Sequence, residues 1–104
     1  TNSPFFKVGI IGFGTVGAGV ASCLLKNADV IAKRTGIKAT LAGIADLDIE
    51  TDRGVAVPKE LLTTDTSAMI RNVDVVVELI GGTTVAKKFI LEALKAGKSM
   101  VTAN

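Results

Sequence analysis

The chain has 104 residues, of which 48% are hydrophobic and 21% are charged, and its formal net charge is +2. This length fits one small domain that buries about 65% of its unfolded surface, and the composition carries no signature of disorder. The basic residues are scattered along the sequence and form no stripe, so nucleic-acid binding has no electrostatic support.

The chain has one cysteine, Cys23, and no histidine, which excludes an internal disulfide and leaves no ligand set for a structural metal. A reducing cytoplasm is the expected compartment. The apolar stretch 8–20 is too short and too rich in glycine for a membrane span, and no targeting segment is expected. Because the chain begins at Thr1 and ends on the apolar stretch 100–104, we expect it to be part of a longer protein.

A glycine-rich turn between a predicted strand and a predicted helix is the first informative element. Val8, Ile10 and Ile11 precede the sequence Gly-Phe-Gly-Thr-Val-Gly over residues 12–17. Apolar residues then recur at helical spacing, which indicates a helix. They are Val16, Val20, Cys23 and Leu24. Strand, turn and helix in this order predict a binding site for a dinucleotide diphosphate.

Each glycine of the turn has a physical role in such a site. Gly12 permits the tight exit from the strand, Gly14 lets the backbone approach a diphosphate, and Gly17 lets the helix lie close to the strand. The free N–H groups and the positive dipole end of the helix would bind the phosphates without any Lys or Arg. A turn that only packs tightly would explain one glycine, but not three.

The helix is expected over about 15–34, with Lys33 and Arg34 at its negative end and Gly36 as a left-handed cap. Cys23 is placed on its core-facing side as a packing residue, since no histidine is present to activate a thiolate. A second strand is expected over 38–45, followed by an irregular connection over 49–59.

Asp46 directly follows the second predicted strand. An acid at this place commonly accepts hydrogen bonds from the adenosine ribose hydroxyls and repels a 2′-phosphate, although it is further from the glycine turn than the usual spacing of about 20 residues. Asp48 is a second candidate for this role. The alternative is a solvated aspartate in a turn.

The strongest strand signal is the β-branched run 73–80, which is typical of a strand buried on both faces of a parallel sheet. A brief strand over 61–63 and a short helix over 66–71, capped by Asp65 or Thr66, precede it. Glu78 in the apolar run needs a partner if it is buried. It could contact a ribose or brace the neighbouring loop, or it could be a partly exposed acid at the strand end.

Gly81 and Gly82 end this strand and leave room for a cofactor ribose or nicotinamide, unless they form an ordinary turn. Thr83 or Thr84 would cap a further helix that ends at Gly97, with Lys87 and Lys88 on its solvated face. Its expected core-facing residues are Val85, Phe89, Ala93 and Leu94. A last short strand is expected over 99–102.

This order of elements predicts an α/β fold of the Rossmann-like, doubly wound type, with a mainly parallel open sheet forming one dinucleotide-binding domain over residues 1–104. Ligands of such sheets lie beyond the carboxyl ends of the strands. Since the last strand would lack part of its covering layer, Met100 and Val101 are expected to be incompletely buried.

Four segments together resemble the amino-terminal domain of homoserine dehydrogenase: 7–17, 76–82, 93–98 and 101–104. The first is shared by many Rossmann enzymes, whereas Glu-Leu-Ile-Gly-Gly and Val-Thr-Ala-Asn together are more particular. The resemblance implies that the diphosphate is held by the turn, whose residues are Gly12, Phe13, Gly14, Thr15, Val16 and Gly17. It implies that the nicotinamide half passes near Ile80, Gly81 and Gly82, and that cofactor and substrate are bordered by Thr102, Ala103 and Asn104.

The family interconverts aspartate semialdehyde and homoserine with a nicotinamide cofactor, in the pathway to threonine and methionine. In its pattern a Lys follows Asn104, and the catalytic groups lie in a second domain that also dimerises. The resemblance therefore implies that this chain supplies the cofactor-binding half, contains no catalytic residue, and is inactive alone.

The cofactor is expected to be NAD or NADP, with NAD favoured. NADP-preferring relatives often carry an Arg just after the second strand, whereas Leu47 follows Asp46 here. Arg53 could fold back and favour NADP instead. Two other functions stay open: an enzyme similar to dihydrodipicolinate reductase, and a module that senses NAD or another nucleotide without catalysis.

Overall fold

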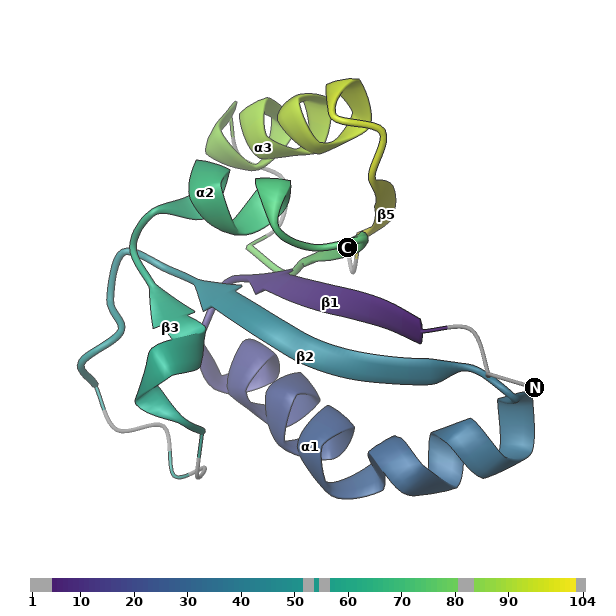
Figure 1. Cartoon of the computed structure of the whole chain (residues 1–104). Coiled ribbons are helices and arrows are strands. Elements are labelled where there is room, and N and C mark those ends of the chain that lie inside the picture. The colour runs from purple at the N-terminus through teal and green to yellow at the C-terminus, as the bar shows by residue number, and fades with distance from the viewer. Residues whose placement is uncertain (1–4, 52–53, 55–56, 81–83, 103–104) are drawn as a thin grey trace.

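A five-stranded parallel sheet forms the centre of the chain, described here as a computed structural model over residues 5–51, 54, 57–80 and 84–102 (Figure 1). The strands are β1 (Phe5–Ile11), β2 (Lys38–Ala45), β3 (Leu62–Thr63), β4 (Val75–Glu78) and β5 (Ser99–Thr102). They lie in the order β3-β2-β1-β4-β5, and every neighbouring pair is parallel. The expected doubly wound sheet is confirmed, and the strand order reverses beside β1.

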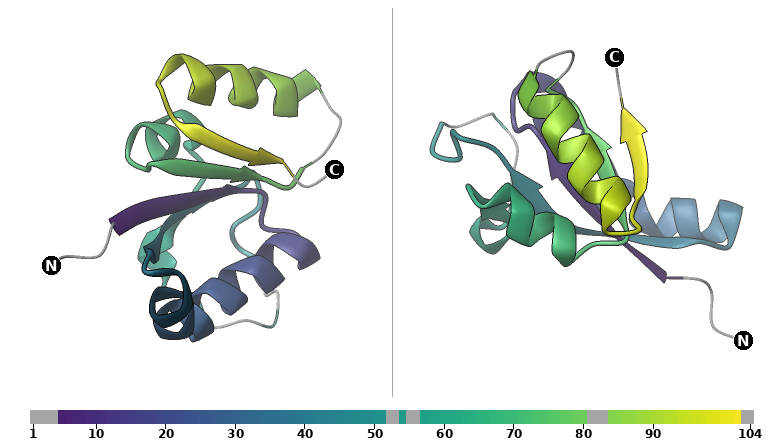
Figure 2. Two further views of the ribbon diagram at one scale, coloured as in Figure 1. Left: turned by 90° about the vertical axis from the view of Figure 1, so that its right-hand side faces the viewer. Right: turned by 90° about the horizontal axis from the view of Figure 1, so that it is seen from above.

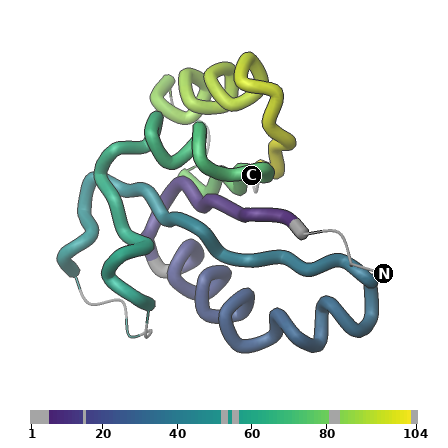
Figure 3. Tube along the Cα trace, viewed as in Figure 1, coloured from purple at the N-terminus to yellow at the C-terminus, as the bar shows by residue number. Residues whose placement is uncertain are grey.

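Helices cover both faces of the sheet (Figure 2). One face carries α1 (Thr15–Thr35), and the other carries α2 (Thr66–Arg71) and α3 (Thr84–Lys95). A single 3₁₀ turn, η1 (Lys59–Leu61), leads into β3. The chain trace in Figure 3 starts with β1 at the centre of the sheet, turns outward through α1 to β2, and later crosses to the other side of β1. This crossing brings the start of α1 and the end of β4 to the same sheet edge.

Two hydrophobic clusters correspond to the two faces. The cluster under α1 contains Ile10, Phe13, Ala18, Ala21, Leu41 and Ile44. The cluster under α2 and α3 contains Ile11, Ala45, Met69, Ile70, Val73, Val76 and Ala93. Consecutive residues of β1, Ile10 and Ile11, therefore enter opposite layers, as the alternation of side chains along a buried strand requires.

The strand limits agree with the sequence analysis at β2 and differ at β4. The expected strand 38–45 is confirmed, but β4 covers only Val75–Glu78 of the expected 73–80. The strand is shorter because β4 is paired with its two neighbours, β1 and β5, only over residues 75–78. β-branched composition thus marked the strand but not its ends.

Helix α1 ends as expected. Gly36 adopts a left-handed conformation with φ of 72°, and its N–H donates to the Ala32 carbonyl at 2.9 Å. The expected apolar stripe is wrong at two positions, since Val16 is 65% exposed and Cys23 is also exposed. Ala18 and Ala21 are buried instead, and the expected Val20 and Leu24 pack against the same cluster. They follow Gly17, whose contact with the glycine turn sets which face of the helix meets the sheet.

Helix α2 lies very close to the sheet because two strand residues are glycines. A Cβ atom on Gly9 would lie 2.1 Å from Met69 Sδ, and one on Gly43 would lie 2.7 Å from Met69 Cγ. Met69 therefore occupies the space above β1 and β2 that these residues leave open. Of the two predicted caps of α2, Asp65 and Thr66, the N-cap is Asp65, whose carboxylate accepts from the Ala68 N–H at 3.0 Å.

Helix α3 packs through small residues. Ala86 and Ala93 are buried and Phe89 is half-buried, whereas Val85 and Leu94 are 54% and 55% exposed. The expectation that Val85 and Leu94 face the core is therefore wrong, because the alanines, and not the larger side chains, mark the contact face. At the edge of the sheet, Val101 of β5 is 53% exposed, as expected, and Met100 is half-buried. Across the described ranges, no helix is long and apolar enough to cross a membrane.

Candidate functional site

The glycine turn lies at the carboxyl edge of the sheet, directly beyond β1. Gly12 has φ of 114°, a conformation that favours glycine, and its N–H donates to the Ala45 carbonyl at 2.8 Å. A Cβ on Gly12 would also lie 3.0 Å from the Ile80 side chain. The chain therefore leaves β1 sharply while staying hydrogen-bonded to the end of β2.

Gly17 allows the first turn of α1 to touch this exit. A Cβ on Gly17 would lie 2.0 Å from the Gly12 carbonyl oxygen, which is a backbone atom with little freedom to move. The absence of a side chain on Gly17 therefore determines how closely the helix approaches the strand, as the sequence analysis expected.

Gly14 is different, because nothing within the described chain requires a glycine there. Its backbone is extended, with φ of −74° and ψ of −166°, and a Cβ would meet no described atom within 4 Å apart from its immediate neighbours. Gly14 is the N-cap of α1, and the first N–H groups of a helix have no acceptor within the helix. The turn is thus an open cradle of N–H donors that a side chain at position 14 would fill, and this fits a diphosphate.

The turn has three residues besides its glycines, and two of them, Phe13 and Val16, have contrasting surroundings. The Phe13 side chain is 4% exposed and belongs to the cluster under α1, so only backbone atoms of Phe13 are available to a ligand. Val16 is 65% exposed at the start of α1, close to Gly14 in the sequence. Thr15 lies in the first turn of the same helix.

Asp46 stands at the end of β2 and is half-buried. Its Oδ2 atom accepts from the Phe13 N–H at 2.5 Å, and its Oδ1 atom accepts from the Asp48 N–H at 3.0 Å. Its own N–H donates to the Thr63 carbonyl at 3.1 Å. The structure therefore brings the predicted acid and the predicted turn into direct contact, which no spacing rule had indicated.

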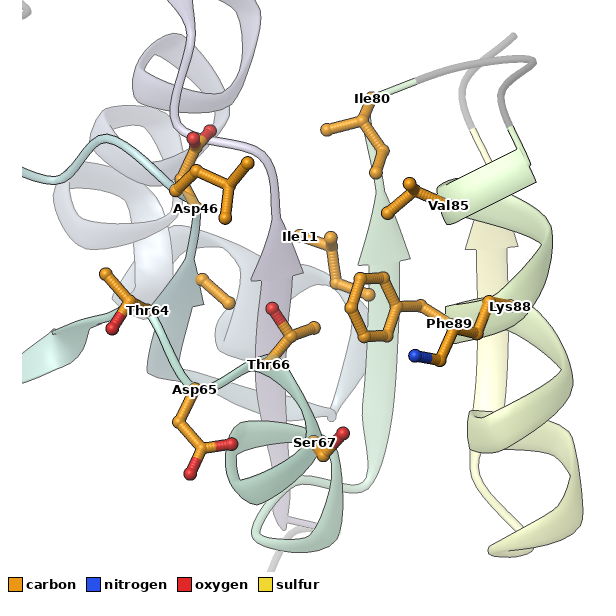
Figure 4. A pocket seen from close by; sticks show the side chains of 12 residues that line it. Ile11, Asp46, Thr64, Asp65, Thr66, Ser67, Ile80, Val85, Lys88 and Phe89 are labelled. Atoms are coloured by element: carbon orange, nitrogen blue, oxygen red, sulfur yellow. The ribbon is translucent and has the colours of Figure 1, made fainter.

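A cavity of about 470 Å³ opens at this edge, on the face covered by α2 and α3 (Figure 4). Ile11 lies at its floor at the end of β1, and Asp46 and Ile80 stand at its border. Ala45, at the end of β2, also lines the cavity. The other lining residues come from the loop after β2, the start of α2 and the first turns of α3. They are Leu47, Thr64, Asp65, Thr66, Ser67, Val85, Lys88 and Phe89.

Among these lining residues, the sequence analysis predicted only Asp46 and Ile80 to contact the cofactor. Topology was the missing information, because β3 is parallel to β2 and therefore delivers the residues after Thr63 to the same edge. Lys88 was expected on a solvated face; it is exposed, but it also lines the cavity. Leu47 is 94% exposed, an unusual position for a large apolar side chain.

The remaining candidate residues are distributed along the same edge. Ile80 is 38% exposed, and Thr102 ends β5 opposite Glu78 in the register. Four predicted cofactor contacts, Gly81, Gly82, Ala103 and Asn104, lie outside the described residues, as does Arg53.

Glu78 ends β4 and is only 2% exposed, so the alternative of a partly exposed acid is wrong. In the register it stands between Ile11 of β1 and Thr102 of β5, and it takes part in an interaction within the fold. Cys23, expected in the core, is exposed on α1, and the amide nitrogen of Asn27 lies 3.7 Å from its sulfur. No group of three or more His, Cys, Asp or Glu side chains within the described ranges could hold a metal ion.

Together, the doubly wound sheet, the open glycine turn and the cavity beside it define a dinucleotide-binding α/β domain. Residues 12–104 match the family model for the NAD-binding domain of homoserine dehydrogenase, and the chain belongs to this family. The finding favours this assignment over the two alternatives considered from the sequence.

Individual relatives agree with the family assignment. The chain is 42% identical over 100 residues to a homoserine dehydrogenase of Methylobacillus glycogenes, and 46% identical over 99 residues to one of Corynebacterium glutamicum. These matches cover 94% and 93% of this chain but only 24% and 22% of the two relatives. The chain thus spans about a quarter of their length.

Solved structures show the same arrangement. A homoserine dehydrogenase from Thiobacillus denitrificans superposes with a TM-score of 0.83 at 35% identity, over 96% of this chain and 23% of that one. A homoserine dehydrogenase from S. aureus superposes with a TM-score of 0.84 at 26% identity, over 96% of this chain and 26% of that one.

Proposed function

We propose that this chain is the dinucleotide-binding part of an enzyme that interconverts aspartate semialdehyde and homoserine by hydride transfer. Its own task is to bind NAD or NADP, the cofactor that carries the hydride, and to orient it. The substrate and the groups that move its proton belong to the remainder of the protein, which is also the part that forms the homo-oligomer. The single cysteine, which can form no internal disulfide, agrees with a reducing cytoplasm.

The observation that carries this proposal is the open space at Gly14. Gly12 and Gly17 are explained by contacts within the chain, whereas no contact within the described chain requires a glycine at position 14, and the open space there lets a ligand approach the backbone of the turn. The N–H donors of the turn and the positive end of the α1 dipole make an anion the fitting ligand. Backbone donors suffice, so the turn itself contains no Lys or Arg.

The cavity beside the turn suits the adenosine half of the cofactor. Leu47, Ile80 and Val85 supply apolar surface for the base, and Asp46 stands between the cavity and the turn, where a ribose would lie. A carboxylate offers about four acceptor positions, so Asp46 can accept from a ribose hydroxyl besides its two backbone donors. The nicotinamide half would then extend toward Gly81 and Gly82 and toward the segment from Thr102 to Asn104.

Between the two cofactors we favour NAD. The negative charge of Asp46 opposes a 2′-phosphate, and the next residue is the apolar Leu47. Lys88 is the one cation among the described lining residues, and it extends from α3, across the cavity from Asp46 (Figure 4). It therefore compensates little for the charge of Asp46.

Titration of the purified chain with NADH and NADPH tests both parts of this proposal. We expect saturable binding of both cofactors, with NADH binding more tightly, because only NADPH places a phosphate near Asp46. Calorimetry measures both affinities under one buffer condition. If neither cofactor binds, the proposed function is contradicted. If NADPH binds more tightly than NADH, only the preference for NAD is contradicted.

A further inference from the structure

The hydrogen bond between Phe13 and Asp46 extends the contact between β1 and β2 beyond the end of both strands. Within the sheet the two strands pair up to Ile11 and Ala45. The Gly12 N–H then donates to the Ala45 carbonyl at 2.8 Å, and the Phe13 N–H donates to the carboxylate of Asp46 at 2.5 Å. A side chain thus takes over as acceptor where the backbone ladder ends.

Asp46 is itself held on two further sides. Its N–H donates to the Thr63 carbonyl of β3 at 3.1 Å, and its second carboxylate oxygen accepts from the Asp48 N–H at 3.0 Å. The carboxylate is therefore a fixed point to which the turn is attached. Hydrogen bonds to a charged acceptor are stronger than those between neutral groups, so this attachment is firm.

The attachment also decides which donors of the turn remain for a ligand. Since the Phe13 N–H is directed at Asp46, a diphosphate must use the donors that follow it, from Gly14 into the first turn of α1. Without the carboxylate, the Phe13 N–H would lose its acceptor and the turn would lose its link to β2. The Phe13 side chain would still be held by the core under α1.

We infer that Asp46 is a positioning residue for the diphosphate-binding turn, in addition to any contact it makes with the ribose. The inference rests on the proposed function, since it concerns the same ligand. It differs in its consequence, because a residue that only contacts the ribose hydroxyls has no effect on a ligand that lacks both of them, whereas a residue that positions the turn affects every ligand with a diphosphate.

The test compares NADH with its 2′,3′-dideoxy analogue, which lacks both hydroxyls on the adenosine ribose. We expect Asp46→Ala to weaken the binding of both ligands, and to weaken binding of the dideoxy analogue by about tenfold or more. Asp46→Asn keeps one oxygen that can accept from the Phe13 N–H, so it should restore much of the affinity for the analogue. Unchanged affinity of Asp46→Ala for the dideoxy analogue would overturn the inference.

Asp74 provides a matched control. Its Oδ2 atom accepts from the Lys7 N–H at 2.8 Å, which is the same kind of bond to β1 but at the opposite, amino edge of the sheet. Asp74→Ala should therefore lower the unfolding midpoint as other lost hydrogen bonds do, while leaving the affinity for both ligands unchanged. A loss of affinity in Asp74→Ala equal to that in Asp46→Ala would reduce the role of Asp46 to general stability.

A spectroscopic measurement gives an independent readout. The amide proton of Phe13 should resonate far downfield in the unliganded chain, because its acceptor is a close carboxylate, and it should move upfield in Asp46→Ala but little in Asp46→Asn. If the unmutated chain binds neither ligand, the proposed function is wrong, and this amide signal still decides whether Asp46 holds the turn.

Discussion

At the scale of single residues, the three glycines of the turn are present for three separable reasons. Gly12 is needed for its positive φ, and Gly17 because a Cβ would collide with the Gly12 carbonyl oxygen. Gly14 instead keeps the space at the start of α1 open. Only the last reason refers to something outside the chain. Substitution of Gly14 therefore separates ligand binding from folding more cleanly than substitution of either neighbour.

We expect Gly14→Val to fold and to lose cofactor binding. The backbone at position 14 suits any residue, so the free energy of unfolding should change by less than about 1 kcal/mol. The added side chain would occupy the space for the diphosphate and weaken NADH binding by at least about tenfold, or about 1.4 kcal/mol. Calorimetric titration and urea unfolding of the same variant measure the two effects.

Gly19→Ala is the control for this variant. Gly19 is also exposed and a Cβ there would also meet open space, but it lies within α1 and away from the turn. Alanine should stabilise the helix by about 0.5–1 kcal/mol and leave NADH affinity unchanged. Binding by Gly14→Val at the affinity of Gly19→Ala would show that the turn does not hold the diphosphate.

At the scale of elements, the contact between α2 and the sheet depends on a large side chain of the helix that lies over glycines of the strands. Met69 is 6% exposed and fills the space above Gly9 of β1 and Gly43 of β2. Close approach of this short helix brings the residues at its start to the border of the cavity. The size of one core side chain thus helps to set the shape of the site.

A double-mutant cycle on Gly9 and Met69 tests this contact. Met69→Ala should destabilise the chain by about 2–5 kcal/mol, because it leaves a cavity. Gly9→Ala should also destabilise it, since its Cβ would lie 2.1 Å from Met69 Sδ. In the double variant the new methyl group enters the space left by Met69, so the two effects should be less than additive by about 0.5–3 kcal/mol.

Unfolding midpoints in urea for the four proteins of the cycle provide the measurement. If the slope of the unfolding free energy against urea concentration is the same in all four proteins, the differences in stability arise from the native contact and not from changes in the unfolded chain. Strict additivity of the two substitutions would mean that Met69 and Gly9 do not share this space.

The helices and strands also show which features of the fold can be predicted from the sequence. Order, type and approximate limits of the elements were predictable, because β-branched runs, glycine caps and helical spacing are local signals. Which side chains of α1 and α3 face the solvent was predictable only in part. Val16 and Leu94 point outward, whereas the expected Val20, Leu24 and Phe89 do pack against the core, beside small alanines that are fully buried. A pattern of hydrophobicity cannot identify a face whose contact depends on small size.

The site was predictable to a similar extent. The glycine turn and Asp46 follow from motif and strand order, but the bond between Asp46 and Phe13 depends on how β1 and β2 end relative to each other. The cavity depends on residues from several loops that meet only because the strands are parallel. Contacts of this kind are set by three-dimensional register, which a single sequence does not display.

At the scale of the whole molecule, all the candidate residues that the structure describes lie at one edge of one sheet. In the order of the strands, that edge carries the acid after β2, the turn after β1, Ile80 after β4 and Thr102 at the end of β5. An extended ligand such as a dinucleotide fits this linear arrangement, with its diphosphate at the turn. The arrangement orients a cofactor, while hydride transfer additionally needs a substrate carbon held against the nicotinamide and a group that moves the hydroxyl proton.

The isolated chain is therefore expected to bind cofactor without catalysing the reaction. A ligand that binds only the folded chain raises its stability by about 2.7 kcal/mol at a concentration 100 times its dissociation constant, so saturating NADH should raise the thermal unfolding midpoint by several degrees. In Gly14→Val this shift should fall to about half or less at the same NADH concentration, because a tenfold weaker affinity leaves at most about 1.4 kcal/mol of stabilisation. In the same preparation, homoserine should cause no reduction of NAD, because the chain spans only 24% and 22% of the relatives from Methylobacillus glycogenes and Corynebacterium glutamicum. Homoserine-dependent formation of NADH by the purified chain, lost in Gly14→Val, would instead place the proton-transferring group among these 104 residues.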